Sequence, residues 1–177
     1  MALRPPRRLE AAALREYAVG LLGRRALSTG EVRRKLKDRA QDASDIEPLL
    51  HDLRELGFLN DERFAEHYAA RRLSNEGFGA QRVLRDLQQR RVASPIAQEA
   101  VREAFAETDE VQLIEAYLQR RYRAKDLPAF LAEEKNLASA FRRLRTAGFT
   151  ASNSIRVLRR FSQRAEELED EPDAPTE

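Results

Sequence analysis

The organisation of this chain is set by residues 56–68, which read Leu56-Gly-Phe-Leu-Asn-Asp-Glu-Arg-Phe-Ala-Glu-His-Tyr68. An apolar pattern of helical period runs up to this stretch and a second one begins inside it. Gly57 predicts the end of the first helix, because glycine adopts the left-handed C′ conformation without a Cβ clash. Phe58 and Leu59 are too apolar for a free linker, so we expect both to be buried. Asp61 or Asn60 is suited to cap the following helix.

The pattern around this joint is repeated along the chain. Four apolar positions recur at an offset of 51 residues: Tyr17, Leu27, Val32 and Leu36 correspond to Tyr68, Phe78, Val83 and Leu87. A third helical segment with the same Gly-Phe ending, Gly148-Phe149, follows later. No segment alternates with the period of a strand. We therefore predict an all-α fold of three tandem three-helix repeats, in an elongated, curved array.

The predicted parts of the chain follow from these patterns. They are a flexible arm (1–9), repeat 1 (10–59), repeat 2 (60–107), repeat 3 (108–164, with an insertion near 124–135 and a short helical turn from Pro128) and an acidic, disordered tail (165–177). Ser28 and Glu31 are spaced as a capping box for the second helix of repeat 1. Thr150 or Ser152 is suited to cap the final helix.

Composition argues against several classes of protein. The sequence has 177 residues and no Cys, so thiolate catalysis and Cys-based zinc sites are excluded. No apolar run approaches the roughly 20 residues of a membrane span. His51 and His67 have no partners at metal-ligand spacing, and no Walker A motif occurs. We predict a cytoplasmic, monomeric protein that is not an enzyme and carries no cofactor or metal.

Charge is unevenly distributed along the sequence. The formal net charge is +2, and residues 166–177 hold seven acids and no base, so the remainder of the chain carries +9. A polyanionic partner is favoured by this excess, either a nucleic acid or a protein that carries one. A soluble helical protein that happens to be rich in arginine is the alternative.

The candidate binding residues are basic and lie outside the predicted apolar stripes. They are Arg24, Arg25, Arg33, Arg34 and Lys37 in repeat 1, Arg71, Arg72, Arg82 and Arg85 in repeat 2, and Arg120, Arg121, Arg142, Arg143, Arg145, Arg156, Arg159 and Arg160 in repeat 3. Arginine makes planar, bidentate contacts to phosphate and carboxylate. Arg142 with Arg145, and Arg156 with Arg160, share a helical face and are expected to project outward.

Two stretches resemble the RecX family: Ser28-x-x-Glu-Val-Arg-Arg-Lys-Leu36, and Leu53-x-x-Leu-Gly-Phe-Leu-Asn-Asp-Glu-Arg-Phe-Ala65. The resemblance continues through Tyr68, Arg71-Arg72, Gly79, Arg82, Leu87, Arg143-Leu144 and Gly148-Phe149, and so covers roughly residues 12–162. It is weakest over residues 124–135.

The resemblance implies a function that periodicity does not show. Proteins of the RecX family modulate the RecA recombinase by binding RecA filaments on DNA, and they inhibit strand exchange, ATP hydrolysis and coprotease activity. RecA filaments, with weak and non-specific contacts to DNA, are thus the expected partners, in DNA repair and the SOS response. Two alternatives are a helix-turn-helix-like DNA-binding module, which the three-helix units and the Ser-capped second helix favour, and a scaffold whose basic residues are paired internally.

Overall fold

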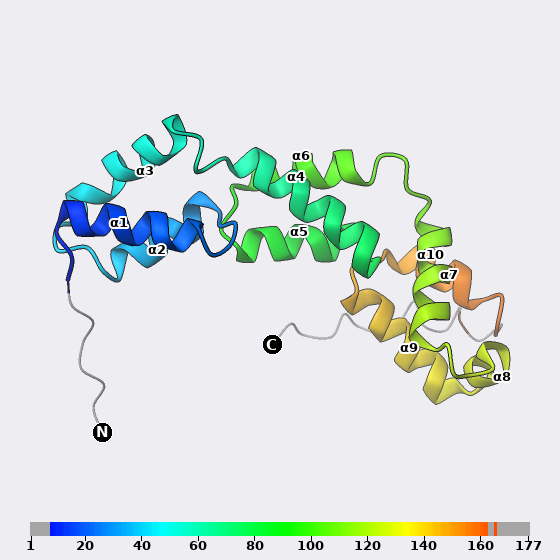
Figure 1. Cartoon of the computed structure of the whole chain (residues 1–177). Helices are drawn as coiled ribbons and strands as arrows, with labels where there is room; N and C mark the ends of the chain where they lie inside the picture. The colour runs from blue at the N-terminus through cyan, green and yellow to red at the C-terminus, as the bar shows by residue number, and fades with distance from the viewer. Residues whose placement is uncertain (1–7, 163–164, 166–177) are drawn as a thin grey trace, which may run out of the picture. The chain divides into compact units, whose positions relative to one another are not determined.

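The structure is a computed structural model that describes residues 8–162 and 165. The described residues form helices and turns, with one isolated bridge between Leu9 and Ala40, so the predicted all-α fold is confirmed (Figure 1). In order along the described chain, the α-helices are α1 (Ala11–Leu22), α2 (Thr29–Lys37), α3 (Ile46–Glu55), α4 (Asp61–Arg71), α5 (Ala80–Gln89), α6 (Ser94–Ala104), α7 (Glu110–Arg121), α8 (Leu127–Ala132), α9 (Glu134–Thr146) and α10 (Ala151–Leu158). A 3₁₀ turn, η1 (Ala43–Asp45), precedes α3, and a π-helical turn, η2 (Arg72–Glu76), follows α4.

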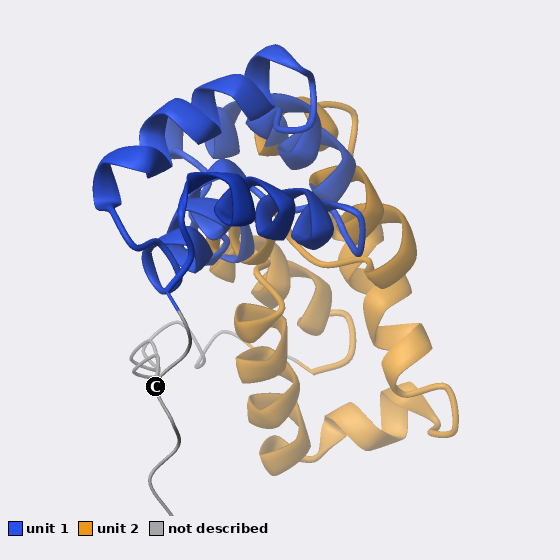
Figure 2. Cartoon of the chain, turned by 60° about the vertical axis from the view of Figure 1, so that its left-hand side comes forward, with its two compact units in different colours: residues 1–68, 86–100 blue, residues 69–85, 101–177 orange. Residues whose placement is uncertain are grey.

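The helices follow the three-repeat plan, with α8 as the extra helix expected near Pro128. Contacts nevertheless divide the chain into two compact units (Figure 2). Unit 1 comprises residues 1–68 and 86–100, and unit 2 comprises residues 69–85 and 101–177. The division falls inside α4, α5 and α6, so the predicted second repeat contributes to both units. The boundaries of the predicted repeats stay a prediction.

Unit 1 has a core of aliphatic side chains from α1, α2 and α3. Leu14, Leu36, Leu50 and Leu53 are all fully buried in it. The capping box is present at the start of α2: the Ser28 hydroxyl accepts from the Glu31 amide, and the Glu31 carboxylate accepts from the Ser28 amide. The cap fixes where α2 begins, and this end of α2 is packed against the backbone of Arg91.

Unit 2 has a separate core built from α7, α8, α9 and α10. Ile114, Leu137, Leu144 and Phe149 are among its most buried members. Thr150 is the residue that caps α10, since its hydroxyl accepts from the Asn153 amide. The Glu110 carboxylate accepts from the Thr150 amide at 2.9 Å, which ties the start of α10 to the start of α7.

The joint at Gly57 departs from expectation in one respect. Gly57 has a φ of 73°, as predicted, and Asn60 caps α4 by accepting from the Arg63 amide at 2.7 Å. Leu59 is buried, but Phe58 is 54% exposed, so the expectation that both would be buried was wrong. The amides of Phe58 and Leu59 both donate to the Leu53 carbonyl, and this tight turn directs only one of the two side chains into the core.

The ends of the described chain also differ from the predicted boundaries. Leu9, assigned to a flexible arm, donates to the Arg39 carbonyl and accepts from the Gln41 amide, and Arg8 donates to the Ala40 carbonyl. Ala165, assigned to the tail, is fully buried in the core of unit 2. The rest of the arm (1–7) and of the predicted disordered tail (166–177) lies outside the described residues.

Candidate anion-binding site

Each unit contains a hollow that is lined by three arginines. The hollow of unit 1 has a volume of about 530 Å³, and its charged lining residues are Arg33, Arg54 and Arg91 with Asp61 and Glu62. The hollow of unit 2 has a volume of about 450 Å³ and is lined by Phe78, Arg82, Tyr117, Ser139, Arg142, Arg143, Thr146 and Ala147. These described lining residues of unit 2 include no acid, so this hollow has the stronger positive charge.

The unit 2 hollow lies where the end of α9 meets the start of α5. The Gly79 amide donates to the Ala147 carbonyl at 2.9 Å, and the Gln81 amide donates to the Gly148 carbonyl at 3.2 Å. Gly148 has a φ of 91°, and a Cβ there would lie 2.2 Å from the Arg82 nitrogen. Only glycine permits both this backbone conformation and this close approach. The two glycines therefore bring Arg82 beside the arginines of α9.

Aromatic rings hold the arginines around this hollow. The guanidinium carbons of Arg72 and Arg82 each lie 5.2 Å from the centre of the Phe78 ring. The Tyr117 ring meets Phe149 edge to face at 5.4 Å. An aromatic face attracts a guanidinium group without neutralising its charge. Of the arginines that line the hollow, Arg82 is thus held in place without loss of its charge.

At the unit 2 hollow, arginines donate to an uncharged acceptor, and one buried donor has no acceptor among the described residues. Arg82 and Arg85 both donate to the Thr146 carbonyl at 3.3 Å, an uncharged acceptor at the C-terminal end of α9. Nε of Arg143 is buried and has no hydrogen-bond partner among the described residues. A buried donor without an acceptor costs about 1–3 kcal/mol. A bound carboxylate or phosphate oxygen would satisfy such a donor.

The unit 1 hollow lies at a corresponding junction, between the start of α2 and the chain after α5. A Cβ on Gly30 would lie 2.4 Å from the Arg91 carbonyl oxygen, so the two backbones are in close contact here as well. The Thr29 amide donates to Asp61 at 2.7 Å, and the buried Ser28 hydroxyl donates to the Arg90 carbonyl. Side-chain groups, a carboxylate acceptor and a hydroxyl donor, therefore help the backbone to hold this junction.

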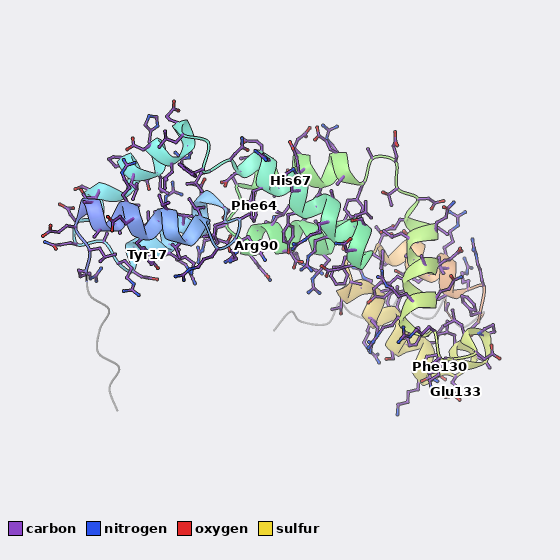
Figure 3. The ribbon with its side chains drawn as sticks, in the orientation of Figure 1. Tyr17, Phe64, His67, Arg90, Phe130 and Glu133 are labelled. Carbon is purple, nitrogen blue, oxygen red and sulfur yellow. The ribbon has the colours of Figure 1, made fainter. Side chains whose placement is uncertain are left out.

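Acidic partners neutralise much of the positive charge in unit 1. Arg33 makes two hydrogen bonds to Glu47, from Nε at 2.7 Å and from Nη2 at 3.0 Å. Glu31 pairs with Arg25 at 3.1 Å and with Arg90 at 3.4 Å. Arg90 also lies over the Tyr68 ring at 4.9 Å, and Tyr68 in turn stacks on Phe64 (Arg90 and Phe64 are labelled in Figure 3).

The Arg33–Glu47 pair changes the protonation equilibria of both groups. The hydrogen bond to Glu47 raises the pKa of Arg33 above its ordinary value, against the opposing effect of burial. The hydrogen bond from Arg33 lowers the pKa of Glu47, and the charges of Arg33, Arg54 and Lys37 add to that effect. Arg33 is therefore paired with Glu47 within the protein.

The remaining candidate residues are distributed between the units. Arg24, Arg34 and Lys37 are exposed in unit 1; Arg71, Arg121, Arg156 and Arg159 are exposed in unit 2. Arg72 pairs with Glu76, Arg120 donates to the Glu76 carbonyl, and Arg160 pairs with Glu115. Arg145 is half-buried and donates to the Phe149 carbonyl at 2.7 Å, so it stabilises the end of α9 instead of projecting outward as expected. Arg82, Arg142 and Arg143 are the candidates that the unit 2 hollow brings together.

Sequence reasoning missed the aromatic members of this hollow. Phe78 was predicted only as an apolar repeat position and Tyr117 was not among the candidates, although both line the hollow. Their spacing gave no signal, because they come from the segment before α5 and from α7. It also missed Leu56 and Phe58, which are exposed apolar side chains at the joint.

The described residues offer neither a metal site nor a membrane span. No three His, Cys, Asp or Glu side chains of the described chain are grouped as a metal ion would require. His67, on α4, is labelled in Figure 3. None of the helices in the described part has the length and apolarity needed to cross a membrane.

Comparison with known proteins agrees with this architecture. Family models of the RecX first three-helix domain and the RecX second three-helix domain match residues 15–53 and 60–101. The chain is 34% identical over 139 residues to "Regulatory protein RecX" of Halorhodospira halophila, covering 78% of this chain and 82% of that protein. It is 32% identical over 162 residues to the protein of the same name from Ralstonia nicotianae, covering 92% and 94%.

Solved structures show the same fold. The crystal structure of RecX from Lactobacillus salivarius superposes with a TM-score of 0.63 at 19% sequence identity, covering 86% of this chain and 97% of that chain. Helix content, repeat plan and sequence similarity over most of the length agree. The chain belongs to the RecX family of regulatory proteins.

Proposed function

We propose that this protein binds RecA filaments assembled on DNA and inhibits their strand-exchange, ATPase and coprotease activities, thereby modulating DNA repair and the SOS response. The observation that carries the proposal is family membership over nearly the whole chain, because the Ralstonia nicotianae relative aligns with 92% of it. On this proposal the protein acts as a cytoplasmic monomer without catalysis or cofactor of its own.

The unit 2 hollow supplies the chemistry that such docking needs. Arg82, Arg142 and Arg143 line one surface with no acid among the described lining residues. Guanidinium groups recognise carboxylates and phosphates through charge-assisted, often bidentate, hydrogen bonds. On this proposal, acidic side chains of RecA are bound at this surface, and the phosphates of the DNA in the filament offer weak, non-specific contacts. The other exposed arginines add further contacts on the same chain, and such contacts add as avidity.

The helix-turn-helix alternative is disfavoured by the packing of the second helices. A recognition helix presents its N-terminal residues to base edges in the major groove. Here the start of α2 is buried, with Ser28 at 0% and Thr29 at 5% exposure. Gly79, just before α5, is likewise buried against Gly148. The scaffold alternative fits unit 1, where arginines pair internally, better than it fits the hollow of unit 2.

The test is RecA-catalysed ATP hydrolysis on single-stranded DNA as the protein is added in increasing amounts. We expect the rate to fall with dose and to saturate, with no ATP hydrolysed by the protein alone. An unchanged rate at saturating protein would contradict the proposal. In parallel, binding to duplexes of unrelated sequence should show equal affinity; a strong preference for one duplex would favour the helix-turn-helix alternative.

A further inference from the structure

The last part of the chain is chemically opposite to the unit 2 hollow. Residues 166–177, hereafter the acidic tail, contain seven acids and no base. The hollow presents Arg82, Arg142 and Arg143 and no acid among its described lining residues. The hollow of unit 1 offers no such match, because Asp61 and Glu62 lie among its arginines. Charge complementarity therefore selects the unit 2 hollow for an acidic segment.

The acidic tail begins directly after a buried residue of unit 2, the unit that contains the hollow. Ala165, directly before it, is fully buried in the core cluster of unit 2, and its amide donates to the Ser162 carbonyl at 3.2 Å. The tail is thus anchored to the unit that contains the hollow. Twelve residues span up to about 40 Å when extended. A compact unit of roughly 100 residues has a radius of gyration of about 13 Å, so the tail is long enough to reach any part of that unit.

The hollow also has the donors that a carboxylate would satisfy. Nε of Arg143 is buried without a hydrogen-bond partner among the described residues. Ser139 and the exposed Arg142 line the same space, where the Thr146 hydroxyl already donates to the Arg142 carbonyl at 2.9 Å. A carboxylate accepts from a guanidinium group through two parallel hydrogen bonds. A segment tethered to the same unit competes at an effective concentration in the millimolar range, which favours it over a partner in dilute solution.

We propose that the acidic tail docks in the hollow of unit 2, with its carboxylates accepting hydrogen bonds from Arg142 and Arg143. The tail then occupies the surface that the RecA filament would use, and a filament must displace it to bind. Docking of the tail is independent of the proposed function; only the competition rests on it. The protein would thus regulate its own access to the partner through a charge contact that salt weakens.

Docking can be tested without any partner. The sequence has no Cys, so Ala174→Cys gives a single site for a nitroxide label and leaves all seven acids in place. We expect paramagnetic broadening of the Ser139, Thr146 and Ala147 amides in the full-length protein, and loss of that broadening at high salt. The control carries the same label with each tail acid changed to its amide, and its broadening should be largely absent. Equal broadening with both tails, or broadening only next to Ala165, would overturn the proposal.

The competition is tested by filament binding. The amide-tail variant of the full chain should bind RecA filaments on single-stranded DNA about tenfold more tightly than the natural tail at low salt, and the gain should vanish when combined with Arg142→Gln and Arg143→Gln. Identical affinities of the natural and amide tails would overturn the competition. If none of the chains bound filaments, the proposed function would fail, while the label experiment would still decide whether the tail docks.

Discussion

The two hollows show how the same junction can be used in two ways. In unit 1, Gly30 lets the start of α2 approach the chain that follows α5. In unit 2, Gly79 and Gly148 let the start of α5 approach the end of α9. In unit 1 the surrounding arginines have carboxylate partners, such as Glu47 for Arg33. In the hollow of unit 2, Arg82 lies over an aromatic ring and donates to a backbone carbonyl.

The difference concerns electrostatics rather than architecture. A carboxylate partner both positions an arginine and neutralises it, whereas an aromatic ring or a carbonyl positions it and leaves its charge in place. Unit 1 therefore gains internal order, and unit 2 retains an anion-binding surface. On the proposed function, this comparison makes the hollow of unit 2 the expected docking surface.

The largest effect is expected from adding a methyl group at the junctions. Gly148→Ala should destabilise the protein by at least about 3 kcal/mol, because its φ is 91° and the new Cβ would lie 2.2 Å from the Arg82 nitrogen. Gly30→Ala lacks the positive φ and should cost less, about 1–3 kcal/mol. Thermal unfolding measures both changes, with shifts of roughly 2–4 °C per kcal/mol expected for a chain of this size.

Gly20→Ala is the matched control for these variants. A Cβ at Gly20 meets nothing within 4 Å, and Gly20 lies inside α1. This change should stabilise the protein by about 0.5–1 kcal/mol through helix propensity. If Gly148→Ala were tolerated as well as Gly20→Ala, the close backbone junction described for unit 2 would be wrong.

The next largest effect is expected on filament binding, when the arginines of the two hollows are replaced in turn. In the amide-tail variant, where the tail does not compete, Arg142→Gln with Arg143→Gln should weaken binding to RecA filaments about tenfold, equivalent to about 1.4 kcal/mol, because two charge-assisted contacts are lost. Arg33→Gln with Arg54→Gln removes the same charge from unit 1 and should change binding by less than about threefold. Filament co-sedimentation over a range of salt concentrations measures both, after thermal unfolding has shown that both variants fold. Equal losses from the two pairs would mean that binding follows net charge alone.

The smallest effect concerns the internal pair of unit 1. Because the folded-state pKa of Glu47 is lowered, its stabilisation is complete above its unfolded pKa and is lost as pH falls through the lowered value. The Glu47 side chain is 63% exposed, so the pair contributes at most about 0.5 kcal/mol. Glu47→Gln should therefore slightly lower the melting temperature at pH 7 and match the natural protein near pH 2. A difference that persisted or grew at low pH would contradict this role.

Much of the fold could be predicted from the sequence, and the reasons are local. Capping at Ser28 and Glu31, and the turn at Gly57, depend on neighbouring residues, and the structure agrees at both places. Phe58 and Leu59 could not be distinguished, since their exposure depends on the hydrogen bonds of the turn to Leu53. The division into two units was also hidden, because it depends on contacts between segments distant in sequence.

For the candidate site, the sequence could predict the type of residue but not which residues form it. The sequence indicated that arginines carry the binding chemistry, but it gave seventeen candidates with no means of ranking them. Ranking requires knowing which arginines have acidic partners, such as Arg160 with Glu115, and which support the backbone, such as Arg145 with the Phe149 carbonyl. Those contacts join different elements, so they appear only when the chain is folded.

Arginine footprinting in the presence of the filament tests the central claim most directly. The amide-tail variant, whose hollow the tail does not cover, is treated with an arginine-specific dicarbonyl, with and without RecA filaments on single-stranded DNA, and the modification rate of each arginine is read by peptide mass spectrometry. We predict that filaments slow modification of Arg82, Arg142 and Arg143 severalfold and leave Arg33, Arg54 and Arg91 unchanged. Protection of the second set with no protection of the first would contradict docking at the hollow of unit 2.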